Sequence, residues 1–353
     1  MGLRIAIMGA GAVGGYAGAY MAQAGEDVTF IDPWPEHVET IRTRGLRISH
    51  LRDVPEFTAK ARALHLMEVQ HLVKEKPIDI AFVCMKSYDT AWATMMISQY
   101  LAPNGFVVSL QNCMNEETVA GVVGWGKVVG CVASSITVEL REAGHVRRAA
   151  GKSGSRHTVF RAGEVHGRIT PRLEEVRRLV GLADSAMVTS NLWGERWSKL
   201  VINAMANGIS ACTGLAGGEM VRNYALRRFA TRVGSEAIRV GEALGYQLEE
   251  IHHLDPEIIA KAGEGDAEAA KLFDDRRLAE ADRASGEQRP SMGQDMVKGR
   301  RTEIEFINGL IARKGGEVGI PTPANKALTD IVKRVERGEL EPDPRHLLEV
   351  RLD

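Results

Sequence analysis

Apolar residues in the first part of the chain come in short runs, each followed by a polar or glycine-rich stretch. The runs at 3–8, 78–86 and 105–112 are continuous, as is typical of strands buried on both faces of a parallel sheet. "EDVTFID" at 26–32 and "GKVVGCVASSITVEL" at 126–140 also resemble strands. Helix-like segments separate several of these runs. This alternation predicts an α/β fold with a doubly wound parallel sheet.

The pattern changes in the second part of the chain. Between 144 and 169, alternating residues and glycines predict antiparallel strands that complete the same sheet. From 191 to 337 nearly every strong signal is helical. The charge-rich segment 264–285 has helical apolar periodicity, and we expect a surface helix there. A length of 353 residues suits two domains, one mixed and one helical.

A glycine-rich loop, "GAGAVG", lies between the first predicted strand and the helix after it. Gly9, Gly11 and Gly14 have the G-x-G-x-x-G spacing. The first glycine permits a tight turn, the second lets backbone amides approach a pyrophosphate, and the third lets the helix pack close to the sheet. Together with Ala12 and Val13 they predict a dinucleotide site at a helix N-terminus, where free N–H groups attract anions.

Asp32 closes the second predicted strand, near the position at which an acidic residue binds the adenosine ribose. A carboxylate would repel a 2′-phosphate, so Asp32 favours NAD over NADP. The alternative is an ordinary turn aspartate before Pro33.

The segment "ERWSKLVINAMAN" at 195–207 places three polar residues in an apolar setting. Lys199, Asn203 and Asn207 are four residues apart, which predicts one polar stripe along a single helix. Lys199 could instead extend from a helix edge into solvent, and the two asparagines could bond neighbouring helices.

Composition narrows the class of protein. Hydrophobic residues make up 44% of the chain and the formal net charge is −1, so we expect binding to neither nucleic acid nor a membrane. The four cysteines have no metal-ligand spacing, which predicts no metal and a reduced compartment. No apolar run approaches the roughly 18 residues of a membrane span, and no signal peptide is recognisable. We expect a soluble cytoplasmic protein.

An ordered set of motifs resembles the ketopantoate reductase (2-dehydropantoate 2-reductase) family over nearly the whole chain. After the glycine loop come "CMKSYDT" with Lys86, "LQNCMNEE" with Asn112, "KLVINAMAN", "SMGQDM" with Ser291, "RRTEIEFINGLI" with Glu303, and "GIPTP". The resemblance implies a Rossmann domain, which we place at 1–185, followed by an all-helical domain at 186–353. It also implies an active site in the cleft between them.

The same resemblance implies hydride transfer from reduced nicotinamide to the ketone of a 2-oxo acid. Lys199 matches the general acid that protonates the carbonyl oxygen. Asn203 and Asn207 match positions that hold the substrate hydroxyl or carboxylate, and Ser291 matches another substrate-binding position. Glu303 matches the acid that bonds the substrate hydroxyl and helps to orient the amine.

Lys86 and Asn112 follow the third and fourth predicted strands, and by resemblance they contact the cofactor. Each residue also has an ordinary interpretation: Lys86 as a strand-end charge, Ser291 as a helix cap, and Glu303 as part of a solvated face. Two features depart from the family. Most members prefer NADPH and have a basic residue near position 32, and most have glycine where this chain has Cys113.

Three functions remain open from the sequence. The leading one is an NAD(P)-dependent oxidoreductase that reduces 2-dehydropantoate to pantoate in pantothenate biosynthesis. The second is an NAD-dependent dehydrogenase of another 2-hydroxy acid from the same family. The third, of a different class, is a non-catalytic nucleotide-sensing protein on a Rossmann domain. In each case the partner is a small molecule, and the long helices leave both a homodimer and a monomer open.

Overall fold

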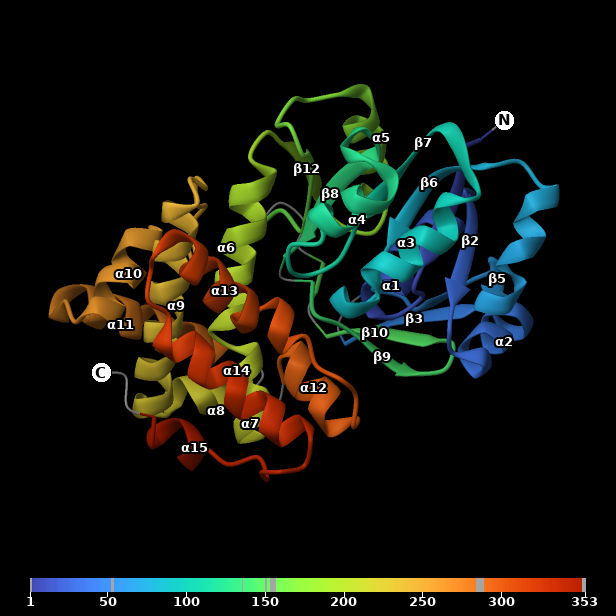
Figure 1. The fold of residues 1–353 in the computed structure, drawn as a ribbon. Coiled ribbons are helices and arrows are strands. Elements are labelled where there is room, and N and C mark those ends of the chain that lie inside the picture. The colour runs from blue at the N-terminus through green and yellow to red at the C-terminus, as the bar shows by residue number, and fades with distance from the viewer. Residues whose placement is uncertain are drawn as a thin grey trace. The chain divides into compact units, whose positions relative to one another are not determined.

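The structure is a computed structural model that describes residues 2–51, 54–134, 136–149, 151–152, 157–283 and 289–350. The chain divides into two compact units, Met1–Leu192 and Trp193–Asp353, whose elements are labelled in Figure 1.

An eight-stranded sheet forms the centre of the first unit, in the order β12-β11-β8-β7-β6-β1-β2-β5. Neighbouring strands are parallel, except that β11 runs antiparallel to β8. The strands are β1 Arg4–Met8, β2 Asp27–Asp32, β5 Arg62–His65, β6 Ile78–Val83, β7 Leu101–Ser109, β8 Val128–Ala133, β11 Phe160–Glu164 and β12 Ala186–Thr189. The strand order reverses between β1 and β6, and ligands bind at such a point in open α/β sheets.

Both faces of this sheet are covered. Alternate residues of β1 separate into two cores: Ile5 and Ile7 pack with the cluster that contains α1 (Ala12–Gln23) and α5 (Pro171–Gly181). Ala6 and Met8 pack with the cluster that contains α3 (Thr90–Ser98) and α4 (Glu116–Val123). The predicted doubly wound sheet is confirmed (Figure 1).

A second sheet of four strands was not predicted. Its order is β4-β3-β10-β9, with bounds β4 Phe57–Ala59, β3 Leu46–His50, β10 His145–Arg148 and β9 Val138–Glu142. The expectation that all strands between 144 and 169 complete the first sheet is therefore wrong for β10 and right for β11. Because β10 pairs in parallel with β3, about a hundred residues earlier, no local pattern could reveal the pairing.

The remaining elements of the first unit are α2 (Pro35–Arg44) and three short 3₁₀ helices, η1 (Leu66–Lys74), η2 (Ser87–Asp89) and η3 (Trp125–Lys127). The unit extends beyond the expected boundary at 185, because β12 pairs with β11 in the first sheet.

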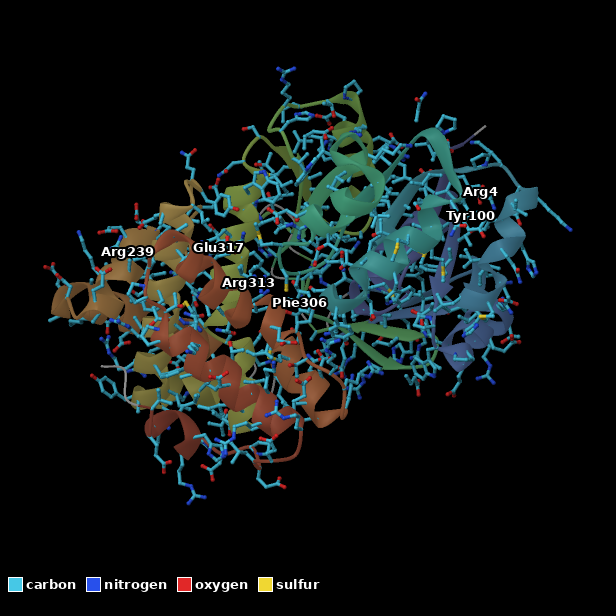
Figure 2. The ribbon with its side chains drawn as sticks, in the orientation of Figure 1. Arg4, Tyr100, Arg239, Phe306, Arg313 and Glu317 are labelled. Atoms are coloured by element: carbon cyan, nitrogen blue, oxygen red, sulfur yellow. The ribbon has the colours of Figure 1, made fainter. Side chains whose placement is uncertain are left out.

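The described elements of the second unit are helical. Their bounds are α6 Leu192–Ala204, α7 Asn207–Thr213, α8 Gly217–Arg222, α9 Tyr224–Ala243, α10 Pro256–Glu264, α11 Ala267–Arg283, α12 Ser291–Val297, η4 Ile304–Phe306, α13 Asn308–Val318, α14 Pro323–Glu336 and α15 Arg345–Leu348. Charged side chains such as Arg313 and Glu317 are exposed on α13 (Figure 2). Among the described helices, none has the length and apolar character needed to cross a membrane.

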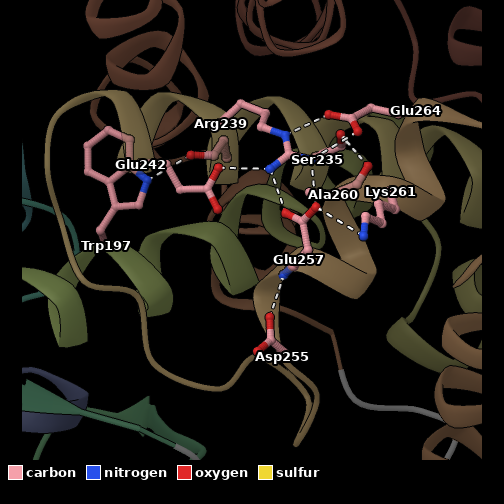
Figure 3. A network of polar contacts seen from close by, with 10 residues as sticks. Trp197, Ser235, Arg239, Glu242, Asp255, Glu257, Ala260, Lys261 and Glu264 are labelled. Atoms are coloured by element: carbon pink, nitrogen blue, oxygen red, sulfur yellow. Dashed lines mark hydrogen bonds and ion pairs between the residues drawn. The ribbon is translucent and has the colours of Figure 1, made fainter.

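An ion-pair network joins α9 to α10. Arg239 pairs with Glu242 at 2.9 Å, with Glu257 at 2.6 Å and with Glu264 at 2.6 Å (Figure 3). These bonds raise the pKa of Arg239 and lower those of Glu257 and Glu264. The network fixes α10 against the helix that also packs on α6.

Candidate functional site

The glycine loop has the geometry of a dinucleotide cradle. Gly9 has φ +96, and a Cβ there would lie 2.7 Å from Met85 Sδ. A Cβ on Gly14 would lie 2.2 Å from the Gly9 oxygen, so the helix start is packed too tightly for any side chain. At Gly11, by contrast, a Cβ would meet nothing within 4 Å. The first and third glycines serve packing, whereas the second faces open space and fits a bound pyrophosphate.

Helix α1 supplies the anion-binding end of this cradle. It begins at Ala12, and Val13 follows in the first turn; both residues are partly exposed. The N-cap is Gly11, which has no side chain to bond the free N–H groups, and the first turn contains no acidic residue. The cradle therefore fits the pyrophosphate of a dinucleotide.

Asp32 holds the glycine loop in place, a contact that the sequence did not reveal. Its Oδ2 accepts the N–H of Ala10 at 2.8 Å and its Oδ1 accepts the N–H of Trp34 at 2.9 Å. Burial raises the pKa of Asp32, and these two N–H groups oppose the rise. Each carboxylate oxygen has another lone pair, so the residue can brace the glycine loop and the turn and still accept a ribose hydroxyl.

Lys86 and Asn112 are close to each other in the fold because the loops that carry them are bonded together. Lys86 is the N-cap of η2, just past β6, and Asn112 lies just past β7. Gln111 Nε2 donates to the Met85 oxygen at 2.8 Å, and Asn115 Nδ2 donates to the Asn112 oxygen at 2.7 Å. Gln111 and Asn115 were missed from the sequence, although both lie in the "LQNCMNEE" motif directly after a strand.

Cys113, one of the two departures from the family, lies at a backbone position that favours glycine. Its φ is +66, in the left-handed region that favours glycine, and the residue is buried. The backbone here thus has the conformation that glycine adopts without cost, and this chain holds a cysteine in it.

The three predicted polar residues of the second unit do not share one helix. Lys199 and Asn203 lie on α6, which ends at Ala204, whereas Asn207 begins α7. Ala206 has φ −127 and its N–H bonds the Asn203 oxygen at 3.2 Å, three residues back instead of four. The prediction of a single stripe is wrong, because the helical hydrogen-bond ladder stops between the two asparagines.

A buried amide network accompanies this break. Asn308 Nδ2 donates to the Ala204 oxygen at 3.2 Å, which satisfies a carbonyl at the end of α6, and to Asn325 Oδ1 at 3.0 Å. Asn325 Nδ2 donates to Glu236 Oε2 at 2.9 Å, and Glu236 also accepts the N–H of Ala324 at 3.0 Å. Glu236 thereby caps α14 and anchors the network. Sequence reasoning missed Asn308, although it lies in the motif that contains Glu303.

Two predicted substrate residues are in direct contact. Asn207 Nδ2 donates to Ser291 Oγ at 3.3 Å, across the boundary between α7 and α12. The N-cap of α12 is Pro290, and no side-chain bond caps it, so Ser291 is not the helix cap. The hydroxyl is instead part of the polar group at the start of α7.

Glu303 lies immediately before η4 and is only 5% exposed, which contradicts its interpretation as part of a solvated face. The next residue, Ile304, packs against α7, because a Cβ on Gly208 would lie 3.1 Å from Ile304 Cδ1. Glu303 is therefore attached to the same helix that begins with Asn207.

Lys199 has the properties of an activated amine. It is partly exposed, and no described residue forms a hydrogen bond or ion pair with its Nζ. Burial lowers its pKa from 10.5 to about 8. On the same face of α6, Asn203 is 7% exposed and its Nδ2 is buried with no hydrogen-bond partner among the described residues. An amine without a counter-ion beside an unsatisfied amide fits an anionic ligand.

The loop after α9 lies close to this lysine. Glu249 N–H donates to the Oγ of Ser198, the neighbour of Lys199, at 2.8 Å. His252 Nδ1 lies 2.9 Å from Glu280 of α11, so the predicted charged surface helix also holds this loop. Burial, with smaller contributions from charges that include Lys199, lowers the pKa of His252 to about 4. The imidazole is therefore neutral at pH 7 and places no second positive charge near Lys199.

The fold and these groups define a class: a Rossmann-type dinucleotide-binding unit followed by a helical unit with an activated lysine. Among the described residues, no group of three or more His, Cys, Asp or Glu side chains could hold a metal ion. The family model "Ketopantoate reductase PanE/ApbA" matches residues 5–158, and "Ketopantoate reductase PanE/ApbA C terminal" matches residues 191–336. The chain belongs to the ketopantoate reductase family.

Proteins similar to this chain match it over nearly its full length. A 2-dehydropantoate 2-reductase of Archaeoglobus fulgidus is 33% identical, over 95% of this chain and 98% of the relative. The crystal structure of a PanE/ApbA family ketopantoate reductase from Ralstonia eutropha JMP134 is 29% identical, with a TM-score of 0.76 over 96% of this chain and 99% of that one. A D-mandelate dehydrogenase solved with NADH and anilino(oxo)acetate shares the fold, at 23% identity and a TM-score of 0.77 over 95% and 99% of the two chains.

Membership of this family makes the chain an oxidoreductase that acts on a 2-oxo acid with NAD(P)H. The alternative of a non-catalytic nucleotide sensor has no support from these comparisons.

Proposed function

We propose that this enzyme reduces 2-dehydropantoate to pantoate with NADH, with Lys199 as the general acid. One observation carries the proposal: an amine in a largely apolar site, with no partner among the described residues and a pKa lowered to about 8, beside a buried amide that lacks a partner. An enzyme that reduces an oxo acid needs a cation for the substrate carboxylate or the developing oxyanion, and a proton for the product hydroxyl.

The chain's residues divide this work. The reduced nicotinamide, when bound, would supply the hydride for the carbonyl carbon. Lys199 gives its proton to the carbonyl oxygen, and its lowered pKa makes the transfer easier near neutral pH. Asn203 donates its unpartnered N–H to the substrate, and the bonded pair Asn207–Ser291 fixes a further polar contact. Glu303 accepts a hydrogen bond from the substrate hydroxyl.

The cofactor preference follows from the end of β2. Gly11 and the free amides of Ala12 and Val13 would hold the pyrophosphate, and Gly9 and Gly14 allow the close packing that shapes the loop. Asp32 accepts the ribose hydroxyls, and its carboxylate repels a 2′-phosphate, so we propose that NADH is used in preference to NADPH. Lys86 and Asn112, on their bonded loops, contact the nicotinamide end.

A screen of 2-oxo acids with NADH and with NADPH tests both parts. We expect turnover of 2-dehydropantoate and faster initial rates with NADH. The variant Lys199→Ala should lose at least a hundredfold in kcat, whereas Lys271→Ala, an exposed lysine on α11, should act as wild type. Full turnover by Lys199→Ala would refute the general acid, and strong NADPH preference would refute the role of Asp32.

A second candidate is the NAD-dependent oxidation of another 2-hydroxy acid, favoured by Asp32 at a position where most of the family has a basic residue. A panel of 2-hydroxy acids with NAD⁺ distinguishes the two. Oxidation of an aromatic or branched acid faster than reduction of 2-dehydropantoate, at matched saturation, would favour this candidate. Size-exclusion chromatography with light scattering would decide between a homodimer and a monomer.

A further inference from the structure

The glycine loop is held by a histidine that neither the motifs nor the family resemblance singled out. His37, on α2, is fully buried. Its Nε2 lies 2.8 Å from the carbonyl oxygen of Ala10, the second residue of "GAGAVG". Its Nδ1 accepts the N–H of Gly144 at 2.8 Å. A ring that accepts at Nδ1 and meets a carbonyl at Nε2 is in the Nε2–H tautomer, so it donates to Ala10.

Ala10 is thereby held through both of its backbone polar groups. Its N–H is donated to Asp32 Oδ2 at 2.8 Å, and its carbonyl accepts from His37. The two clamping side chains are themselves joined through Trp34, whose N–H bonds Asp32 Oδ1 at 2.9 Å. The Trp34 indole also stacks on the His37 ring, with centroids 5.6 Å apart and planes within 15°. Neither side chain can move without disturbing the other.

The far side of the histidine is equally constrained. Gly144 lies in the turn between β9 and β10 of the second sheet, with φ +72. A Cβ there would lie 2.3 Å from Thr40 Cγ2 of α2, so the turn lies directly against the helix that carries His37. The hydrogen bond to Gly144 spans 107 residues of sequence and ties the second sheet to the glycine loop.

We propose that His37 is a positioning residue for dinucleotide binding, which holds the Ala10 carbonyl so that the amides after it keep the geometry of the cradle. This rests on the proposed function only in requiring that a nicotinamide dinucleotide binds at the glycine loop. The second sheet then has a functional role, because it orients the imidazole that orients the loop. Preorganisation of this kind matters because a backbone shift of an ångström in a binding loop is enough to weaken a site severely.

Two substitutions separate the two hydrogen bonds. The amide of glutamine reaches roughly as far as Nε2, so His37→Gln can still donate to Ala10. The amide of asparagine reaches only as far as Nδ1, so His37→Asn can accept from Gly144 but cannot reach Ala10. His37→Phe keeps a ring against Trp34 and removes both bonds. The matched control is His346→Gln, since the Nε2 of His346, on α15 of the second unit, also lies 2.8 Å from a backbone carbonyl oxygen, that of Glu341.

The measurements are the Kd of NADH by fluorescence titration, the KM of the oxo acid at saturating NADH, and the Tm. We expect about tenfold weaker NADH binding for His37→Asn and His37→Phe, a change within about threefold for His37→Gln, and none for His346→Gln. The Tm should fall for all the His37 variants, and the KM of the oxo acid should not change.

Wild-type NADH affinity in His37→Asn would overturn the proposal, as would equal losses in His37→Asn and His37→Gln that follow their Tm values, since a purely structural role predicts that result. If His37→Phe fails to fold, the Gln and Asn pair still decides. A wild-type chain that binds neither NADH nor NADPH would instead refute the proposed function, and that outcome is visible before any variant is made.

Discussion

Replacing Lys199 by methionine should make the protein more stable while abolishing its activity. Methionine has a similar length and no charge, so the variant keeps the packing and removes the ammonium from its apolar site. A shift from a pKa of 10.5 to about 8 corresponds to about 3 kcal/mol, the cost of holding the charged amine in the folded state. Because Lys199 is partly exposed, this figure is an upper bound.

The sign of the pH dependence follows from the direction of the shift. Between about pH 8 and 10.5 the unfolded chain binds the proton that the folded chain has released, so wild-type stability rises with pH in this range. Below about pH 8 the full cost is present. Lys199→Met lacks this titration, so its advantage should be largest at pH 7 and disappear near pH 10.5.

Thermal unfolding followed by circular dichroism measures this directly. Lys199 belongs to the second unit, Trp193–Asp353. For a unit of this size, a difference of about 3 kcal/mol in the free energy of unfolding corresponds to roughly 6–12 °C in Tm at pH 7. The wild type and Lys199→Met should converge as the pH is raised, whereas Lys271→Met should stay parallel to the wild type up to about pH 10. A Tm difference that does not change between pH 7 and pH 10 would show that burial does not penalise the amine. The activity of the wild type should also fall as the pH rises through about 8, since the general acid is lost.

Three further predictions concern the rest of the fold. Asn308→Ala leaves the Ala204 carbonyl without its hydrogen bond, so the free energy of unfolding measured in urea should fall by about 2 kcal/mol. The same variant should raise the KM of the oxo acid more than that of NADH. Cys113→Gly should be about 1 kcal/mol more stable than Cys113→Ala, since both remove the thiol but only glycine suits φ +66; equal stabilities would argue against strain. Arg239→Met should lower the free energy of unfolding by about 1–2 kcal/mol at low ionic strength, and a loss that persists in 1 M salt would contradict an electrostatic origin.

The sequence predicted the parts of the fold that local patterns encode. The buried strands β1, β2, β6 and β7 appeared as apolar runs, and the glycine spacing identified the loop between β1 and α1. Each of these features depends on neighbouring residues. The second sheet did not appear, because β3 and β10 are short and find each other only after the chain has folded.

The contacts of the candidate site also join residues that local sequence patterns cannot connect. A spacing of four residues fits one continuous helix and also two helices with a break between Asn203 and Asn207. Only the structure, in which α6 ends at Ala204 and Asn308 bonds the Ala204 carbonyl, reveals which is present. The contact between Asn207 and Ser291 joins residues 84 positions apart. His37 gave no signal, since its partners are backbone groups, which any sequence supplies.

The bond from Ala10 to Asp32 has a consequence for altering cofactor use. Asp32→Arg is the intuitive route to an NADP-dependent form. It would remove the oxygen that accepts the Ala10 N–H and so holds the glycine loop. Such a redesign would lose affinity for both coenzymes until a second substitution restored an oxygen opposite that amide. Under the proposed function, recognition of the ribose and rigidity of the turn depend on the same carboxylate.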